Sequence, residues 1–107
     1  MDELLTLLKQ IGLPYAYDHF APGKAPAPPF LCYLKPETHN FAADGIVYLS
    51  VEVVHVELYT DYKNPAIEKR VETVLTDAGI FFDKTEVYIE SEHLFEVLYS
   101  FEWKGEE

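Results

Sequence analysis

Residues 64–103 carry the pattern that decides the fold, and their sequence is NPAIEKRVETVLTDAGIFFDKTEVYIESEHLFEVLYSFEW. Asn64 and Pro65 supply a helix N-cap and a first-turn proline, and Gly79 suits the left-handed position just past the helix. Apolar residues between them recur at helical spacing, namely Ile67, Val71, Val74, Leu75 and Ala78. This segment predicts an amphipathic helix with one side in water.

The second half of the same stretch predicts a β-hairpin. Apolar and polar residues alternate over 81–89 and again over 94–103, which gives one apolar and one acidic face. The acidic positions are Glu86, Glu90, Glu96 and Glu102. Carboxylates also gather in metal sites, but alternate positions on paired strands are more typical of a face in water. We therefore expect a solvated acidic face.

Further elements are predicted toward the N-terminus. Leucine and isoleucine repeat at helical spacing over 4–11, and Gly12 and Pro14 end that helix. Residues 30–34 have the length and aromatic content of a buried strand. A proline-rich connector covers 22–29.

A second strand is predicted over 47–59, where the apolar phase jumps between Val53 and Val54. Such a jump indicates one inserted residue, so we expect a β-bulge at that step. Residues 35–45 contain several turn formers and predict a long hairpin loop between the first two strands.

The elements follow the order α-β-β-α-β-β. This order predicts an α+β fold with a largely antiparallel sheet of about four strands and two helices packed on one face. At 107 residues, the chain has the size of one domain, 1–107. Its last residues, 104–107, predict a disordered acidic tail.

The charge balance argues against nucleic acid as a ligand. The chain has 19 Asp or Glu and 8 Lys or Arg, a formal net charge of -11, whereas affinity for phosphates comes largely from basic residues. Cys32 is the only cysteine, and the first residues are acidic, which predicts a protein made in the cytoplasm. No apolar run approaches the roughly 20 residues needed to span a bilayer.

No pattern of catalytic residues stands out. The four histidines are dispersed, without the spacing of metal ligands. Asp18 and His19 are adjacent in a loop, and a polar loop pair explains them better than an acid-base pair does. Cys32 lies in an apolar run and is expected to pack as a small hydrophobic residue. We expect no enzymatic activity, no metal and no cofactor.

Several stretches together resemble small tail-associated proteins from phages and prophages of Gram-positive bacteria. They are APPFLCYL (27–34), ETHNFAADG (37–45), VYLSVEVVHVELYTD (47–61) and NPAIEKRVETVLTDAGIFFDKTEVYIESEHLFEVLYSF (64–101). The resemblance spans residues 4–103, and the order of elements is similar to that of tail-terminator or tail-completion proteins. It implies a non-enzymatic structural protein of the virion tail that contacts other tail or connector proteins.

The resemblance also implies a ring-like homo-oligomer, in which each copy presents two different surfaces. Turn formers of the long loop and surplus aromatic residues are the candidates for these surfaces, namely Asn40, Phe41, Asp44, Tyr48 and Tyr62. The acidic face would repel passing DNA and keep it from binding. Another head-tail connector or minor tail component is the first alternative, and a cytosolic ligand-binding or regulatory domain is the second.

Overall fold

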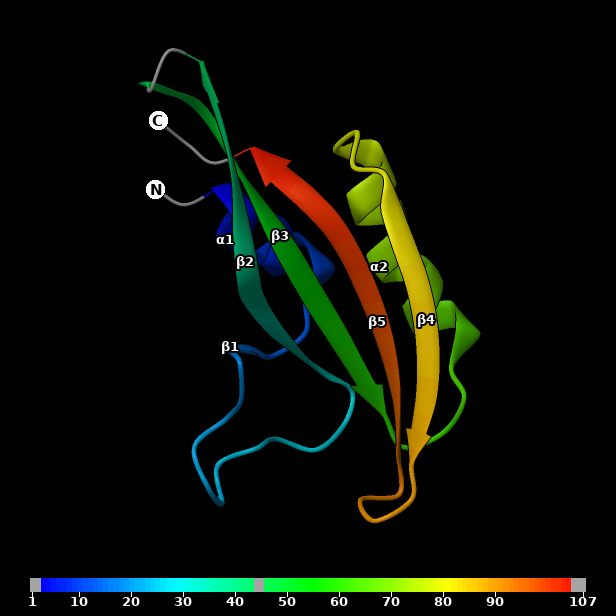
Figure 1. The fold of residues 1–107 in the computed structure, drawn as a ribbon. Helices are drawn as coiled ribbons and strands as arrows, with labels where there is room; N and C mark the ends of the chain where they lie inside the picture. The colour runs from blue at the N-terminus through cyan, green and yellow to red at the C-terminus, as the bar shows by residue number, and fades with distance from the viewer. Residues whose placement is uncertain (1–2, 44–45, 105–107) are drawn as a thin grey trace.

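The computed structural model describes residues 3–43 and 46–104, and the side chains of 40–43, 46–50 and 104 lie outside the description. Figure 1 shows two helices beside one twisted sheet. The elements are α1 (Glu3–Ile11), β1 (Tyr15–Tyr17), β2 (Phe30–Ala43), β3 (Ile46–Thr60), α2 (Pro65–Asp77), β4 (Phe82–Ile89) and β5 (Leu94–Lys104).

Both predicted helices are confirmed. The side chain of Asn64 accepts a hydrogen bond of 3.2 Å from the backbone N–H of Ile67, so it caps the first turn of α2. The two helices are joined by Arg70, whose Nε donates to the carbonyl oxygen of Ile11 at 2.7 Å. This contact satisfies a carbonyl at the end of α1 that has no partner within the helix.

The sheet has five strands in the order β1-β2-β3-β5-β4, one more than predicted. All neighbouring pairs are antiparallel except β1 and β2, which are parallel. The missed strand, β1, has only three residues, too few to show an alternating pattern. The sheet is therefore mixed, and its extra strand lies at the edge.

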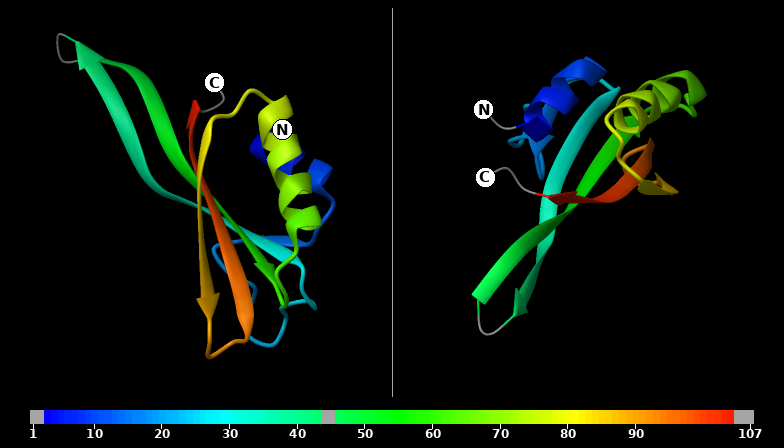
Figure 2. Two further views of the ribbon diagram at one scale, coloured as in Figure 1. Left: turned by 90° about the vertical axis from the view of Figure 1, so that its right-hand side faces the viewer. Right: turned by 90° about the horizontal axis from the view of Figure 1, so that it is seen from above.

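Both helices lie on one face of the sheet, as Figure 2 shows. The buried side chains that fill the space between the helices and the sheet are Leu4, Leu8, Ile11, Leu31, Val54, Val56, Leu58, Val71, Leu75, Val97, Tyr99 and Phe101. Burying one such side chain contributes roughly 1.5–3 kcal/mol. This layer is the core, and the opposite face of the sheet, here called the open face, has no helix over it.

The loop predicted over 35–45 is mostly strand. β2 continues to Ala43 and pairs with β3 from its start at Ile46, so the hairpin is much longer than the sequence indicated. Turn-forming residues within 35–45 led to the wrong prediction, because a polar stretch can still pair when a regular strand lies beside it. The turn itself, 44–45, lies outside the described residues.

The predicted β-bulge occurs at the expected level of the sheet but in the other strand. Lys35 and Pro36 of β2 both lie opposite the single residue Val54, whereas β3 pairs with β5 without interruption. Proline has no N–H to donate to a neighbouring strand and is tolerated at a bulge. Pro36 therefore explains the irregularity better than the phase of β3 does.

Candidate functional site

The β2–β3 hairpin projects beyond the rest of the sheet as an arm, here defined as residues 37–43 and 46–50 (Figure 2). β1 pairs only with residues 31–33 of β2, and β5 pairs with β3 only from Val51 onward. Within the described residues, each strand of the arm thus has one neighbour and one free edge. Free edges of this kind are sites where another strand can add.

The far side of the sheet ends at β4, which pairs only with β5 among the described residues. Large apolar side chains are exposed along this edge: Phe81 by 92%, Val87 by 52% and Tyr88 by 46%. Edge strands are usually protected by charge, and this one has no charged side chain after Glu86. The β4 edge therefore has the composition of a contact surface.

A hollow of about 500 Å³ extends over the sheet from the base of the arm to the start of β4. Val51 and Val53 line one end, and Ile80 and Phe81 line the other. Asp83 and Glu102 also line it, together with Gly79, Ser100 and Phe101. The hollow combines apolar walls with two carboxylates, so a partner side chain could rest there beside Phe81.

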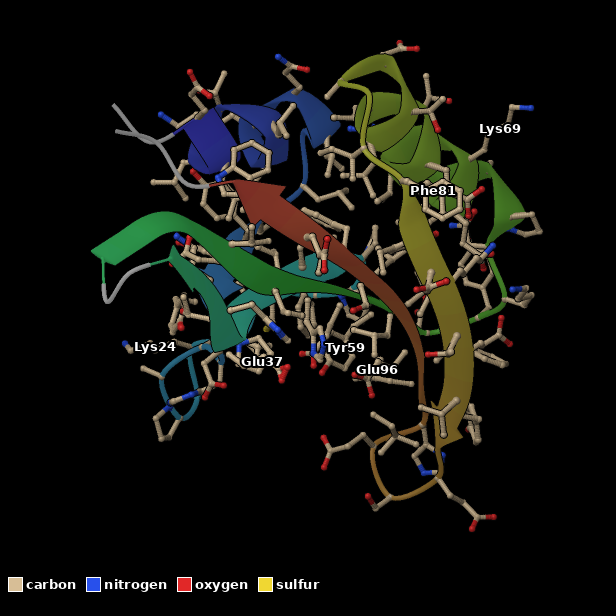
Figure 3. The ribbon with its side chains drawn as sticks, turned by 45° about the horizontal axis from the view of Figure 1, so that its top comes forward. Lys24, Glu37, Tyr59, Lys69, Phe81 and Glu96 are labelled. Atoms are coloured by element: carbon tan, nitrogen blue, oxygen red, sulfur yellow. The ribbon has the colours of Figure 1, made fainter. Side chains whose placement is uncertain are left out.

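The open face carries an acidic cluster. Glu57 lies opposite Leu98, and its neighbour Tyr59 lies opposite Glu96, so the two glutamates are diagonal neighbours. Figure 3 shows Tyr59 and Glu96 on the side of the sheet away from the helices. The hydroxyl of Tyr59 donates to Glu57 Oε1 at 3.0 Å.

Burial raises the pKa of Glu57 above its usual 4.5, and the negative charges of Glu96 and Asp18 add to the effect, although the Tyr59 hydrogen bond opposes it. Burial, together with the negative charges of Glu57, Asp18 and Glu96, raises the pKa of Cys32 to about 11. A thiol held in its neutral form is a poor nucleophile. The structure thus agrees with packing as the role of Cys32, which is almost fully buried.

The segment between β1 and β2 covers part of the open face. The ring of Phe20 lies edge-on to Phe30 at 5.3 Å, and Phe30 stacks on Tyr59 at 5.2 Å. A cavity of about 280 Å³ lies beside these rings and reaches the β4–β5 turn at Glu92. Asp18 and His19, the predicted polar loop pair, are joined by a 2.8 Å contact at its rim.

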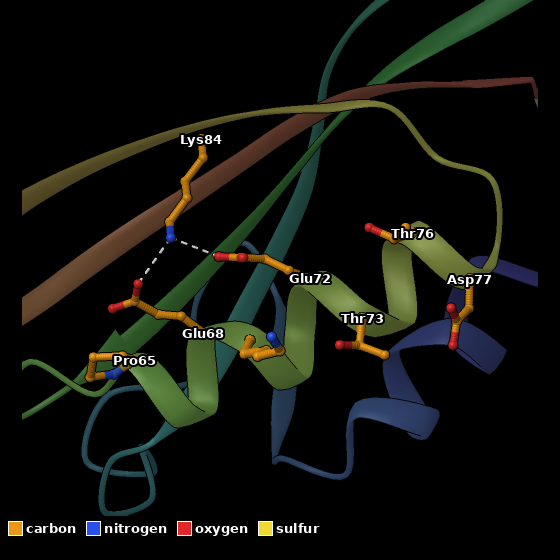
Figure 4. A pocket seen from close by; sticks show the side chains of 8 residues that line it. Pro65, Glu68, Glu72, Thr73, Thr76, Asp77 and Lys84 are labelled. Carbon is orange, nitrogen blue, oxygen red and sulfur yellow. Dashed lines mark hydrogen bonds and ion pairs between the residues drawn. The ribbon is translucent and has the colours of Figure 1, made fainter.

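A second charged cluster lies between α2 and β4, beside a cavity of about 440 Å³ (Figure 4). Lys84 Nζ lies 2.7 Å from Glu72 Oε2 and 3.0 Å from Glu68 Oε1, and Lys63 Nζ lies 2.7 Å from the other oxygen of Glu68. The hydroxyl of Tyr99 donates to Glu72 at 2.8 Å. These contacts fix the position of α2 on the sheet and leave Glu68 buried but paired.

The residues predicted as a protein interface do not form one surface. The backbones of Asn40, Phe41 and Tyr48 belong to the arm, and Asp44 lies outside the described residues. Tyr62 instead follows the last residue of β3, the strand that begins in the arm and ends at Thr60, and its hydroxyl accepts a hydrogen bond from Asn64. The sequence analysis predicted a loop over 35–45 in place of the long hairpin, so it could not show that Tyr62 and the residues of the arm lie at different parts of the sheet.

The predicted acidic face is also divided. Glu96 and Glu102 lie on the open face, opposite Val87 and Val53. Glu86 instead lies opposite the buried Val97, on the helix side, and forms an ion pair with Lys63. Glu90 belongs to the exposed β4–β5 turn. The sequence analysis placed Glu86 on the face in water, but it lies on the helix side of β4. Its ion pair with Lys63, which makes this position possible, is not evident from the sequence.

Three further features escaped the sequence analysis. Glu57 was not singled out, because its diagonal pairing with Glu96 depends on the register of β3 and β5. Phe81 seemed part of a strand, although β4 begins only at the next residue. The free edge of β2 could not be foreseen while residues 35–45 were taken as a loop.

Neither a metal site nor a membrane-spanning helix is found in the part of the chain that the structure describes. There, no three His, Cys, Asp or Glu side chains come together in a way that could hold a metal ion. No helix of residues 3–43 or 46–104 is long and apolar enough to cross a membrane.

The fold has a counterpart among solved structures. A chain from the structure described as "Virion of native gene transfer agent (GTA) particle" superposes with a TM-score of 0.65 at 16% sequence identity, covering 94% of this chain and 84% of that one. No family model matches the sequence. No curated protein matches it in sequence either. The chain is thus similar in fold to a component of a virus-like particle.

Proposed function

We propose that this chain is a non-enzymatic structural protein of a phage-like particle. The observation that carries the proposal is the shared fold with a chain of a gene transfer agent virion, which extends over 94% of the sequence. The two free sheet edges and the exposed Phe81 support it, because they are features of a surface that contacts other proteins.

Within such a particle, the proposed role is tail termination or completion at the head-proximal end of the tail, in a ring of identical copies. A ring needs two different surfaces on each copy, and the outer edge of β2 in the arm and the β4 edge lie on opposite sides of the sheet. Another head-tail connector or minor tail component remains the alternative role.

The open face is proposed to stay free of nucleic acid. Glu57, Glu96 and Glu102 all project from it, and the net charge of the chain is -11. A surface of this sign repels phosphate and allows DNA to pass without binding. In this proposal the partners are other copies and other particle proteins, with neither nucleic acid nor a membrane as a direct ligand.

Electron microscopy of particles produced without the protein tests the proposal. Unjoined heads accompanied by tails of irregular length are the expected result. Normal, joined particles would rule out tail completion. Joined particles with another defect would favour the alternative role as a minor component.

The arm is tested separately by Phe41→Ala. We expect the substituted protein to remain folded and to fail in particle assembly. If it assembles normally, the assignment of Phe41 to an interface is wrong, whatever the role of the rest of the chain.

A further inference from the structure

We propose that the free edge of β2 pairs with the β4 edge of a second copy, so that the sheets of neighbouring copies continue into one another. The inference rests on the proposed function for the presence of a neighbouring copy. It adds the two segments that meet, the direction in which they pair and the side chains that face each other.

The first argument is the backbone of the two edges. Within the described residues, no strand pairs with the outer side of β2 from residue 37 to 43 or with that of β4 from 82 to 89. A strand with one free edge presents a row of unpaired N–H and C=O groups. Seven residues on one edge and eight on the other are similar lengths for a shared ladder.

Strand direction is the second argument. β2 is antiparallel to β3, β3 to β5, and β5 to β4, so β4 runs opposite to β2. A second copy placed in the same orientation beside the first would therefore offer its β4 antiparallel to β2. Antiparallel pairing gives the straighter hydrogen bonds and is slightly more stable per residue.

Charge is the third argument, since a chain with a net charge of -11 repels its own copies. Residues 37–43 contain one Glu and no Lys or Arg, and β4 contains two acidic residues and one Lys, so each edge has a net charge of only -1. The seam between these edges therefore avoids most of the repulsion. Exposed Val87 and Tyr88 would gain cover there.

The two edges lie at different heights along the strands, which is the fourth argument. Phe82, at the start of β4, pairs with Phe101 of β5, and Phe101 pairs with Val54 of β3. Val54 in turn lies opposite the bulge in β2, so β4 starts beside the bulge when the sheet is followed across its strands. The arm begins where β4 begins and extends away from it. A neighbour must then be displaced along the strand direction, and a closed sheet of tilted strands requires such a stagger.

Pairing in a continuous sheet has a consequence for side chains. Glu37 and His39 lie opposite Val53 and Val51, whereas Thr85 lies opposite Leu98 and Glu86 opposite the buried Val97. His39 and Thr85 thus belong to the open face and Glu86 to the helix face. Side chains of one face meet only side chains of the same face across a ladder.

Disulfide trapping between copies can test the pairing, because only cysteines on the same face can meet. The experiment uses the full-length protein with Cys32→Ser, so that the introduced cysteines are the only thiols. The pairs His39→Cys with Thr85→Cys, and His39→Cys with Val87→Cys, sample two registers on the open face. His39→Cys with Glu86→Cys is the matched control on the other face. A disulfide requires Cα atoms within about 7 Å, so assembled particles, or concentrated protein, should give a cross-linked ladder only with an open-face pair.

Each outcome is decisive for the pairing. A ladder beyond the dimer with an open-face pair and none with the control supports head-to-tail pairing. Absence of any ladder in particles that contain the protein overturns it while leaving the proposed function intact. If the single substitution Thr85→Cys, without His39→Cys, is enough for cross-linking, the two β4 edges pair with each other and the proposed β2–β4 pairing is wrong. Normal particles without the protein would instead remove the proposed function.

Discussion

The ammonium of Lys84 on β4 lies 3.0 Å from a carboxylate oxygen of Glu68 on α2, a residue that is only 4% exposed. Burying a carboxylate is costly unless cations and hydrogen bonds compensate for the lost water. Lys84 and Lys63 provide that compensation from two separate segments. The position of α2 on the sheet therefore depends on a charge pair as well as on apolar packing.

Replacing Lys84 with Met should destabilise the fold by about 2 kcal/mol, less than removal of one partner from a fully buried pair, because Lys63 remains. Lys69 on the exposed side of α2 (Figure 3) provides the control. Lys69→Met should change the unfolding free energy by less than about 0.5 kcal/mol. If urea denaturation shows that both substitutions lower the unfolding free energy equally, the ion pair between Lys84 and Glu68 makes no specific contribution to stability.

The pH dependence of the same pair follows from the pKa of Glu68. Burial raises that pKa, but hydrogen bonds from Lys63 and Lys84 outweigh burial and hold it below the usual 4.5. The stabilisation is therefore complete above the unfolded-state pKa and is lost as the pH falls through the lower folded-state value. Glu68→Gln should be destabilising at pH 7, with a difference from wild type that shrinks below 4.5.

Glu57 should behave in the opposite way. Its folded-state pKa is raised by burial and by the charges of Glu96 and Asp18, so the ionised form opposes folding at neutral pH and protonation relieves the cost as the pH falls. Glu57→Gln keeps an acceptor for Tyr59 and should stabilise the protein at pH 7. The gain should disappear below pH 4.5, and a gain independent of pH would contradict this account.

Gly12 and Gly79 form a matched pair for backbone strain, with φ of +83° and +77°. Both Gly→Ala substitutions place a side chain in the left-handed region, which costs about 1–2 kcal/mol. At Gly12 the new Cβ would also lie 2.6 Å from the guanidinium of Arg70, whereas Gly79 has open space. Gly12→Ala should therefore lower the unfolding free energy more, and Arg70→Ala should remove the difference.

Local signals explain which parts of the fold were predictable. Asn64, Pro65 and Gly79 delimit α2 through backbone chemistry that acts within a few residues, and the structure has the helix there. The arm was missed because residues 35–43 become a strand only by pairing with β3, and no short-range signal within 35–45 indicates that pairing. Strand pairing depends on neighbours distant in sequence, and turn-forming residues give no warning of it.

The candidate surfaces were less predictable than the fold for the same reason. Glu86 and Glu96 have equivalent positions in an alternating pattern, yet one is paired with Lys63 on the helix side and the other projects from the open face. Only the register of β4 with β5 and the position of the loop before α2 distinguish them. Composition alone gave the sign of the charge but not its location.

Phe81 and Phe82 are adjacent in sequence and should separate assembly from folding. Phe82 packs against the core, with its ring 5.3 Å from that of Tyr99, whereas Phe81 is 92% exposed at the rim of the hollow beside β4. Phe82→Ala should cost about 3 kcal/mol because it leaves a cavity. Phe81→Ala should change stability by less than about 0.5 kcal/mol and still reduce incorporation into particles, since exposed aromatic residues are frequent anchors of interfaces. Thermal unfolding of the purified variants, together with quantification of the protein in isolated particles, measures both effects. If Phe81→Ala is incorporated as well as wild type, the start of β4 is not part of the contact surface.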